Sequence, residues 1–212
     1  MKKTTVLLVD DHELVRAGFR RLLEDDDVFT VVSEAGSGEE AVQEYSKLHP
    51  DVVVMDISMP GIGGIGAIER IIARYPEAKI LVLSVHEDSV FTTRALQAGA
   101  KGFMPKRTAP EEMIKAVEQV ANGKMCIDPA IAQEIAMQKM TGTNNVIDAL
   151  SQREFEIFRL LAEGKTVNEI ADILSLSPKT VGTHHTSIKQ KLDVSNSAEI
   201  ARLAIRSGLL DA

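Results

Sequence analysis

The chain has 212 residues, of which 44% are hydrophobic and 26% are charged, and its formal net charge is -7 at pH 7. This length and composition predict a globular protein of two domains, and no apolar run approaches the roughly 18 residues of a membrane-spanning helix. The single cysteine, Cys126, excludes an internal disulfide, and the short apolar run near the start does not form a signal peptide. We therefore expect a cytoplasmic protein that does not enter a membrane.

The charge is unevenly distributed along the chain. Residues 1–122 carry 14 basic and 20 acidic side chains, whereas residues 149–212 carry 8 of each. A neutral second part does not by itself indicate nucleic-acid binding. Such a prediction has to rest on where single residues are placed.

Five short apolar strands alternate with amphipathic helical segments in the first part of the chain. The strands are predicted at residues 6–9, 29–32, 52–55, 80–83 and 102–104. This alternation is typical of repeated βαβ units. It predicts an α/β domain at residues 1–122, with a doubly wound, five-stranded parallel sheet covered by helices on both faces.

Polar side chains follow the predicted strands at their carboxyl ends. These side chains are Asp10 and Asp11 after the first strand, Asp56 after the third, Ser84 after the fourth and Lys106 after the fifth. Because the carboxyl ends of parallel strands share one edge of a sheet, we expect them to meet there. Three neighbouring carboxylates repel one another unless a divalent cation holds them ionised, and Mg²⁺ suits carboxylates together with phosphate oxygens. A carboxylate such as Asp56 can also attack phosphorus and form an acyl phosphate, which Lys106 and Ser84 would stabilise.

These residues also have simpler interpretations. The two aspartates after the first strand could cap the following helix, Asp56 could belong to a turn, and Ser84 could be an ordinary polar residue at a strand end. His12 and His86 flank the predicted site. We assign neither a role, because a lone histidine beside carboxylates is usually a solvated neighbour.

Four segments together resemble the receiver domain of two-component signalling systems. They are VDDH at 9–12, MDISMPGIGG at 55–64, LS at 83–84 and GAKGFMPK at 99–106. The resemblance covers roughly residues 5 to 122 and implies a flavodoxin-like strand order, 2-1-3-4-5. It also implies that Asp56 is the phosphoacceptor and that a sensor histidine kinase is the partner that supplies the phosphoryl group.

The same resemblance implies the roles of the surrounding residues. Mg²⁺ would be held by Asp11, Asp56 and the backbone carbonyl of Ser58, with Asp10 assisting through a water molecule. The phosphoryl contact and switch residues would be Lys106, Ser84 and Phe103, and we expect Phe103 in the core as well. One departure is Pro105, which precedes the lysine, whereas receivers more often have a proline after it.

Residues 123–148 are predicted to link two domains. A short helix is expected at 129–139, and residues 141–145 are small and polar. A flexible tether and a packed helix both agree with this composition.

The remaining residues, 149–212, predict a small all-α domain of four helices that includes a helix-turn-helix. Capping boxes are predicted for the pairs Ser151 and Glu154, Thr166 and Glu169, and Asn196 and Glu199. Ser177 and Pro178 open the third helix, at 178–192. At 100° per residue, this helix buries Val181, His185, Ile188 and Leu192. The predicted DNA-binding residues are Lys179, Thr180, Thr183, Thr186, Lys189, Gln190 and Lys191. A solvated helix face with a few lysines is the alternative.

Residues 150–194 are similar to the LuxR-type helix-turn-helix, and with the receiver they are typical of NarL/FixJ response regulators, closest in layout to the GacA/UvrY branch. The resemblance implies a phosphorylation-controlled transcription regulator that binds double-stranded DNA and forms homodimers on phosphorylation or DNA binding. Its last helix would dimerise through Glu199, Leu203 and Arg206. Many relatives have a lysine where this chain has Gly182, so their base-reading pattern is not transferred.

Two other classes of function fit these residues less well. A phosphohydrolase of the haloacid dehalogenase type would use Asp56 as nucleophile, but it needs a second aspartate where this chain has Ser58. A phosphorylation-independent binding module would not need the acidic pair or Lys106. We therefore predict a regulator rather than an enzyme.

Overall fold

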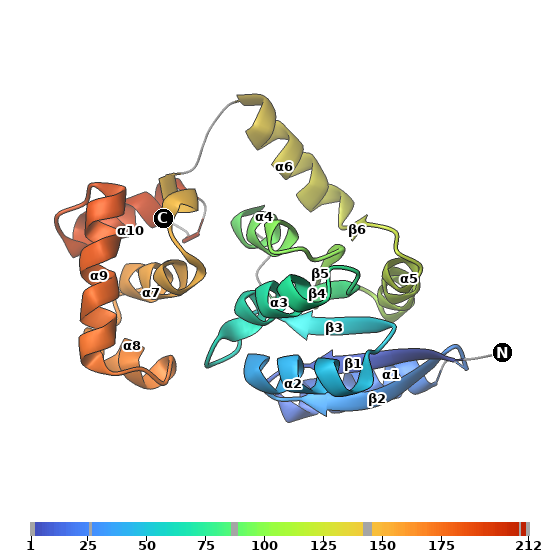
Figure 1. The fold of residues 1–212 in the computed structure, drawn as a ribbon. Coiled ribbons are helices and arrows are strands. Elements are labelled where there is room, and N and C mark those ends of the chain that lie inside the picture. The colour runs from blue at the N-terminus through green and yellow to red at the C-terminus, as the bar shows by residue number, and fades with distance from the viewer. Residues whose placement is uncertain (1–2, 26, 86–88, 142–145, 208, 211–212) are drawn as a thin grey trace. The chain divides into compact units, whose positions relative to one another are not determined.

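The computed structural model describes residues 3–25, 27–85, 89–141, 146–207 and 209–210. The chain forms two compact units, Met1–Ile135 and Ala136–Ala212, and Figure 1 shows their elements. Within these described ranges, the structure contains no helix long and apolar enough to span a bilayer.

The first unit is built on a parallel sheet with the strand order β2-β1-β3-β4-β5-β6 (Figure 1). Its strands are β1 (Thr4–Val9), β2 (Phe29–Ala35), β3 (Val52–Asp56), β4 (Ile80–Ser84), β5 (Gly102–Pro105) and β6 (Cys126–Ile127). The five predicted strands and their order are confirmed.

The sheet has a sixth strand, β6, that the prediction of five strands omitted. Cys126 and Ile127 pair with Gly102 and Phe103 at the outer edge of β5. The sequence around this strand contains turn-forming residues, and two residues are too few to show an alternating pattern. They become a strand because the edge of β5 offers unpaired backbone groups.

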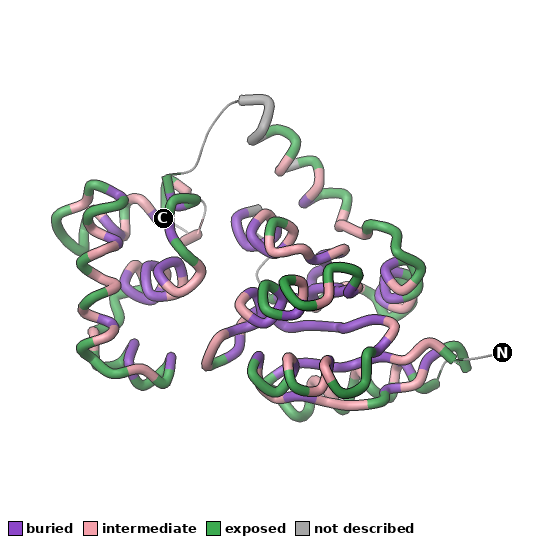
Figure 2. The backbone as a smooth tube through the Cα atoms, viewed as in Figure 1, coloured by how far each residue is buried: buried purple, intermediate pink, exposed green. Residues whose placement is uncertain are grey.

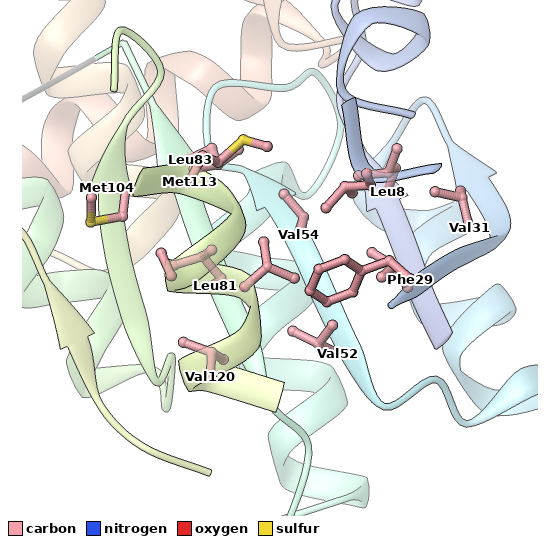
Figure 3. Packing of buried hydrophobic residues seen from close by; sticks show 14 residues of the cluster. Leu8, Phe29, Val31, Val52, Val54, Leu81, Leu83, Met104, Met113 and Val120 are labelled. Carbon is pink, nitrogen blue, oxygen red and sulfur yellow. The ribbon is translucent and has the colours of Figure 1, made fainter. Parts of the chain in front are cut away.

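Five helices connect the strands and cover the sheet. They are α1 (Glu13–Glu24), α2 (Gly38–Leu48), α3 (Gly63–Arg74), α4 (Ser89–Gln97) and α5 (Pro110–Ala121). On one face, alternate residues of β1, β3 and β4 form a cluster with α1 and α5, which includes Leu8, Val54 and Leu81 of the strands and Met113 and Val120 of α5 (Figure 3). Every residue of β3 and β4 is buried (Figure 2), as expected for strands with helices on both faces.

Helix α6 (Pro129–Thr141) contains the helix predicted at 129–139, and the boundary between the two units falls within it. The second unit then contains a 3₁₀ turn, η1 (Val146–Ala149), and the helices α7 (Gln152–Ala162), α8 (Val167–Ile173), α9 (Pro178–Leu192) and α10 (Ser197–Arg206). Four helices after residue 149 agree with the prediction. His86 and residues 142–145 of the predicted polar segment lie outside the described residues.

Two of the three predicted capping boxes are confirmed, at Ser151 and Thr166. At α10 the prediction was wrong in part. The Asn196 side chain does accept the backbone N–H of Glu199, but the Glu199 carboxylate accepts the N–H of Ser195, at 2.6 Å, instead of the N–H of Asn196. The Ser195 hydroxyl also donates to this carboxylate, which explains the choice.

Candidate functional site

Three strand ends bring one amine between two buried carboxylates. Asp10 follows β1, Asp56 ends β3, and Lys106 follows β5. The Lys106 Nζ lies 2.5 Å from Asp10 Oδ2 and 2.7 Å from Asp56 Oδ2. These side chains are 13%, 5% and 2% exposed. Residues 50 and 96 positions from the lysine along the chain therefore form one site at the carboxyl edge of the sheet.

Two further side chains complete the cluster. Asp10, Asp11, His12 and Asp56 each offer a ligand atom, and these atoms all lie within 4.8 Å of one another. The His12 Nδ1 lies 2.9 Å from Asp11 Oδ1 and 3.3 Å from Asp10 Oδ1. Carboxylate oxygens are the ligands that hard divalent cations prefer, so this donor set fits a metal ion.

The charges of the cluster do not balance. Three carboxylates face one lysine, whose burial lowers its pKa, but hydrogen bonds and charge interactions with Asp10 and Asp56 outweigh burial and raise the pKa of Lys106 above its ordinary value. Lys106 therefore stays protonated. The site keeps an excess of negative charge that a divalent cation would neutralise.

The loop after β3 is held close to Asp56. The backbone N–H of Ser58 donates to Asp56 Oδ1 at 3.1 Å. Gly64 packs so tightly that a Cβ atom there would overlap the Asp56 carbonyl oxygen. Gly61 has a φ of 77°, which favours glycine, and the Glu39 carboxylate beside it accepts the N–H of Ile62 at 3.0 Å.

The two predicted switch residues lie on β4 and β5. Ser84 is the last residue of β4 and is fully buried, and Phe103 on β5 is fully buried next to Val82. Pro105 lies opposite Ser84 in the pairing register, and the N–H of Lys106 donates to the Ser84 carbonyl at 2.8 Å. This hydrogen bond connects Lys106 to the end of β4. Pro105, the residue before Lys106, has no N–H and cannot form such a bond.

In the second unit, α9 presents the face that the sequence predicts. Lys179, Thr183, Thr186 and Gln190 are exposed. Val181, Ile188 and Leu192 are buried, while His185 is only half-buried, and burial together with Lys189 lowers the pKa of its imidazole. The Thr183 and Thr186 hydroxyls donate to backbone carbonyls four residues earlier, so their oxygens and methyl groups remain available on this face.

Besides Thr183 and Thr186, three more residues of the predicted DNA-binding set have partners. Lys191 Nζ lies 2.6 Å from Glu154 Oε2, Lys189 Nζ donates to the Ser195 carbonyl at 2.9 Å, and the Thr180 and Ser177 hydroxyls are 2.7 Å apart. Among the described lysines of α9, only Lys179 has no such partner.

Glu154 is the buried centre of this arrangement. Its carboxylate accepts hydrogen bonds from Ser187 at 2.6 Å and from the Ser151 N–H at 2.7 Å, in addition to Lys191. Burial alone would raise the pKa of Glu154, but these partners lower it to about 2. The carboxylate therefore joins the start of α7 to α9.

The predicted dimerisation residues line one side of α10. Leu203 is half-buried and Arg206 is exposed, while Glu199 is engaged in capping the helix. Together with the end of α9 they border an open pocket of about 590 Å³. The lining residues are Val146, Leu192, Asp193, Val194, Glu199, Arg202, Leu203, Ile205 and Arg206.

Two residues are more prominent in the structure than the sequence predicts. His12 was set aside as a solvated neighbour, yet its ring contacts the acidic pair. Glu154 was identified only as a capping residue. Its spacing of 33 and 37 residues from Ser187 and Lys191 carries no local pattern. The sequence VDDH places a histidine, which can bind metal, next to two acids. This was the signal that could have predicted a role for His12.

Two family models match the chain. The Response regulator receiver domain matches residues 6–118, and the model described as Bacterial regulatory proteins, luxR family, matches residues 148–204. Similar proteins include Response regulator GacA of Pseudomonas viridiflava, 44% identical over 98% of both chains. Response regulator UvrY of Shigella flexneri is 43% identical over 98% of this chain and 96% of its own. The predicted resemblance to this branch is confirmed.

Solved structures agree with these matches. RcsB from Salmonella enterica serovar Typhimurium, bound to promoter rprA in the presence of phosphomimetic BeF3-, is 28% identical, with a TM-score of 0.66 over 95% of this chain and 98% of that one. A LuxR-family two-component response regulator from Aurantimonas sp. is 40% identical, with a TM-score of 0.63 over 66% of this chain and 99% of that one.

Proposed function

The chain belongs to the response regulators that combine a receiver domain with a LuxR-type DNA-binding domain, and we propose here how its residues perform phosphorylation-controlled regulation of transcription. Residues 1–122 would form the receiver domain, residues 149–212 the DNA-binding domain, and residues 123–148 the link. The partners are a sensor histidine kinase and double-stranded DNA, and the protein would act in the cytoplasm, where both are accessible.

Asp56 is the phosphoacceptor in this proposal. An Asp56 oxygen attacks the phosphorus of a kinase phosphohistidine, an O–P bond forms, the P–N bond breaks, and the imidazole leaves with the nitrogen electron pair. Lys106 is placed to neutralise a phosphoryl oxygen, because its Nζ already lies 2.7 Å from Asp56. The single observation that supports the assignment most is this buried amine between two carboxylates.

Mg²⁺ would be held by Asp11, Asp56 and the Ser58 backbone carbonyl, with Asp10 assisting through water, and it would supply positive charge to the phosphoryl oxygens. The protein side chains orient the acceptor. The Ser58 N–H holds one Asp56 oxygen at 3.1 Å, and the other oxygen faces Lys106.

Ser84 and Phe103 would change conformation in response to the phosphoryl group. A dianion bound to Asp56 adds strong acceptor oxygens near the end of β4, which favours a conformation in which Ser84 donates to it. Because Phe103 is fully buried, its movement would have to be coupled to the surrounding core. A bias of a few kcal/mol is enough to make a minor conformation the main one.

The output is DNA binding through α9. Lys179 would contact a phosphate directly. Lys189 and Lys191 would add positive charge to this face while they stay bound to Ser195 and Glu154, and Thr180, Thr183, Thr186 and Gln190 would approach the bases. The RcsB structure bound to a promoter supports this use of the fold. Homodimers that form through Glu199, Leu203 and Arg206 on α10 would engage two half-sites about one helical turn apart.

The experiment that tests the acceptor compares two aspartates of the same chain segment. With acetyl phosphate and Mg²⁺, the intact chain should gain one phosphoryl group by mass spectrometry, and Asp56→Asn should gain none. Asp51→Asn, which changes the carboxylate just before β3, should still be labelled. Labelling of the Asp56 variant at the level of the intact chain would refute the assignment.

A further inference from the structure

We infer that His12 is an additional ligand of the cation site, used by transition-metal ions such as Co²⁺ and Mn²⁺ but not by Mg²⁺. The inference rests on the proposed function, because it assumes that a divalent cation binds at Asp11 and Asp56. It adds a nitrogen ligand and a metal preference to that site.

The ring of His12 already occupies the position of a neighbouring ligand. Its Nδ1 lies 2.9 Å from Asp11 Oδ1 and 3.3 Å from Asp10 Oδ1. In an octahedral site with metal–ligand distances of about 2.1 Å, adjacent ligand atoms are about 3.0 Å apart. The imidazole nitrogen and the Asp11 oxygen therefore stand at the separation of two ligands on one edge of an octahedron.

The backbone of His12 is fixed beside the cluster. The N–H of His12 donates to Asp10 Oδ1 at 2.9 Å, and His12 is the N-cap residue of α1. An ion at Asp11 would therefore lie within reach of the imidazole. The rest of the ring is accessible, because the His12 side chain is 67% exposed.

The proton balance is simple. The Nδ1 lies beside two carboxylate oxygens, and it donates to them in the tautomer that has its proton on Nδ1. A cation takes the Nδ1 lone pair, and the proton of the neutral ring moves to Nε2, where water can accept its hydrogen bond because the side chain is exposed. No proton has to enter or leave a buried position.

The chemistry of the donor decides which ions use it. Mg²⁺ strongly prefers oxygen and keeps several of its waters, so a water would replace the imidazole in its shell. Imidazole suits the later first-row ions, and affinity for a site with a nitrogen ligand rises from Mn²⁺, which favours oxygen more, to Co²⁺. His12 should therefore strengthen Co²⁺ binding most and Mn²⁺ binding less, while Mg²⁺ binding stays the same.

The alternative is that His12 only shields the charge of Asp11 with a hydrogen bond. Shielding would change the affinity for every divalent cation by a similar factor. Ligation changes only the affinity for ions that take nitrogen, and it also places a nitrogen nucleus in direct contact with the ion.

The test uses the full chain and the variants His12→Gln, Asp56→Asn and His49→Gln. His49 is another exposed histidine of the first unit, away from the cluster, and serves as the matched control. Affinities for Co²⁺ and Mg²⁺ are measured by titration calorimetry, and bound Mn²⁺ is observed by electron spin-echo envelope modulation, which detects a coordinated ¹⁴N. We expect His12→Gln to weaken Co²⁺ about tenfold or more, to change Mg²⁺ by less than about twofold and to remove the ¹⁴N coupling.

The other outcomes separate this inference from the proposed function. Equal losses for Co²⁺ and Mg²⁺, or Mn²⁺ bound without ¹⁴N coupling, would overturn the role of His12 and leave the cation site standing. A ¹⁴N coupling that persists in Asp56→Asn, or disappears in His49→Gln, would place the ion elsewhere and also overturn it. If no cation binds to the intact chain, the proposed Mg²⁺ site fails as well.

Discussion

Each unit of this protein contains a buried carboxylate paired with a lysine, but the two pairs differ in what surrounds them. Asp56 lies 2.7 Å from Lys106, and Glu154 lies 2.6 Å from Lys191. Around Asp56 there are two more carboxylates and no second lysine within the described cluster. Glu154 instead receives hydrogen bonds from Ser187 and Ser151 as well, so its charge is fully satisfied.

This difference separates a site that can react from a site that stabilises the fold. A satisfied buried carboxylate holds its neighbours in place and offers nothing to a ligand. A cluster with surplus negative charge is poised to take up positive charge and phosphate. The same residue types thus serve opposite purposes, and the count of partners tells them apart.

The two units also differ in how closely a glycine packs against its neighbours. Gly64 lies against the Asp56 carbonyl, whereas Gly182 on α9 has open space where a Cβ atom would be. Gly64→Ala should destabilise the first unit by about 3 kcal/mol, because the loop after β3 must move. Gly182→Ala should stabilise α9 by about 0.5–1 kcal/mol.

Urea unfolding distinguishes these two effects within the full chain. Both tyrosines, Tyr45 and Tyr75, belong to the first unit, and the chain has no tryptophan. Tyrosine fluorescence should therefore report the loss of stability in the Gly64 variant. Circular dichroism of the helices should report the gain of stability in the Gly182 variant. Equal changes for the two alanines would contradict the contrast in packing.

The second prediction concerns the satisfied carboxylate. The pKa of Glu154 is lowered to about 2, so its contribution to stability is complete above about pH 4.5 and is lost as the pH falls through about 2. Glu154→Gln should reduce the free energy of unfolding of the second unit by roughly 2 to 3 kcal/mol at neutral pH, and remove this acid dependence. Circular dichroism during urea unfolding at several pH values measures both.

A surface glutamate provides the control for this variant. Glu163, the C-cap residue of α7, pairs with Arg159 at 3.2 Å, and both side chains are partly exposed. Glu163→Gln should change stability by less than about 0.5 kcal/mol. If the two glutamine variants behaved alike, Glu154 would not be the link between α7 and α9 that the geometry indicates.

The smallest predicted effect compares two lysines of α9. Lys179 is exposed and unpaired, whereas Lys191 is held by Glu154. Lys179→Ala should make the dependence of log affinity for DNA on log salt shallower by about 0.9, the value for one phosphate contact. Lys191→Ala should leave this slope nearly unchanged and lower the stability of the second unit. A reduced slope in the Lys191 variant would show that this lysine leaves Glu154 when DNA binds.

The sequence by itself determined the features that depend on neighbours along the chain. The apolar run 52–55 predicted a covered strand, and the acids at strand ends predicted one edge with several charges. The caps at Ser151 and Thr166 followed from residues three positions apart, because helix caps are made by local hydrogen bonds.

Only the tertiary structure decided which partner each charged group takes. Lys191 lies on the helix predicted to bind DNA, yet it pairs with a glutamate 37 positions earlier in the chain. The Glu199 carboxylate accepts the N–H of Ser195, and Cys126 lies in an edge strand. A carboxylate or a free backbone edge takes the donor that folding brings nearest, and that distance is set by packing rather than by any spacing in the sequence.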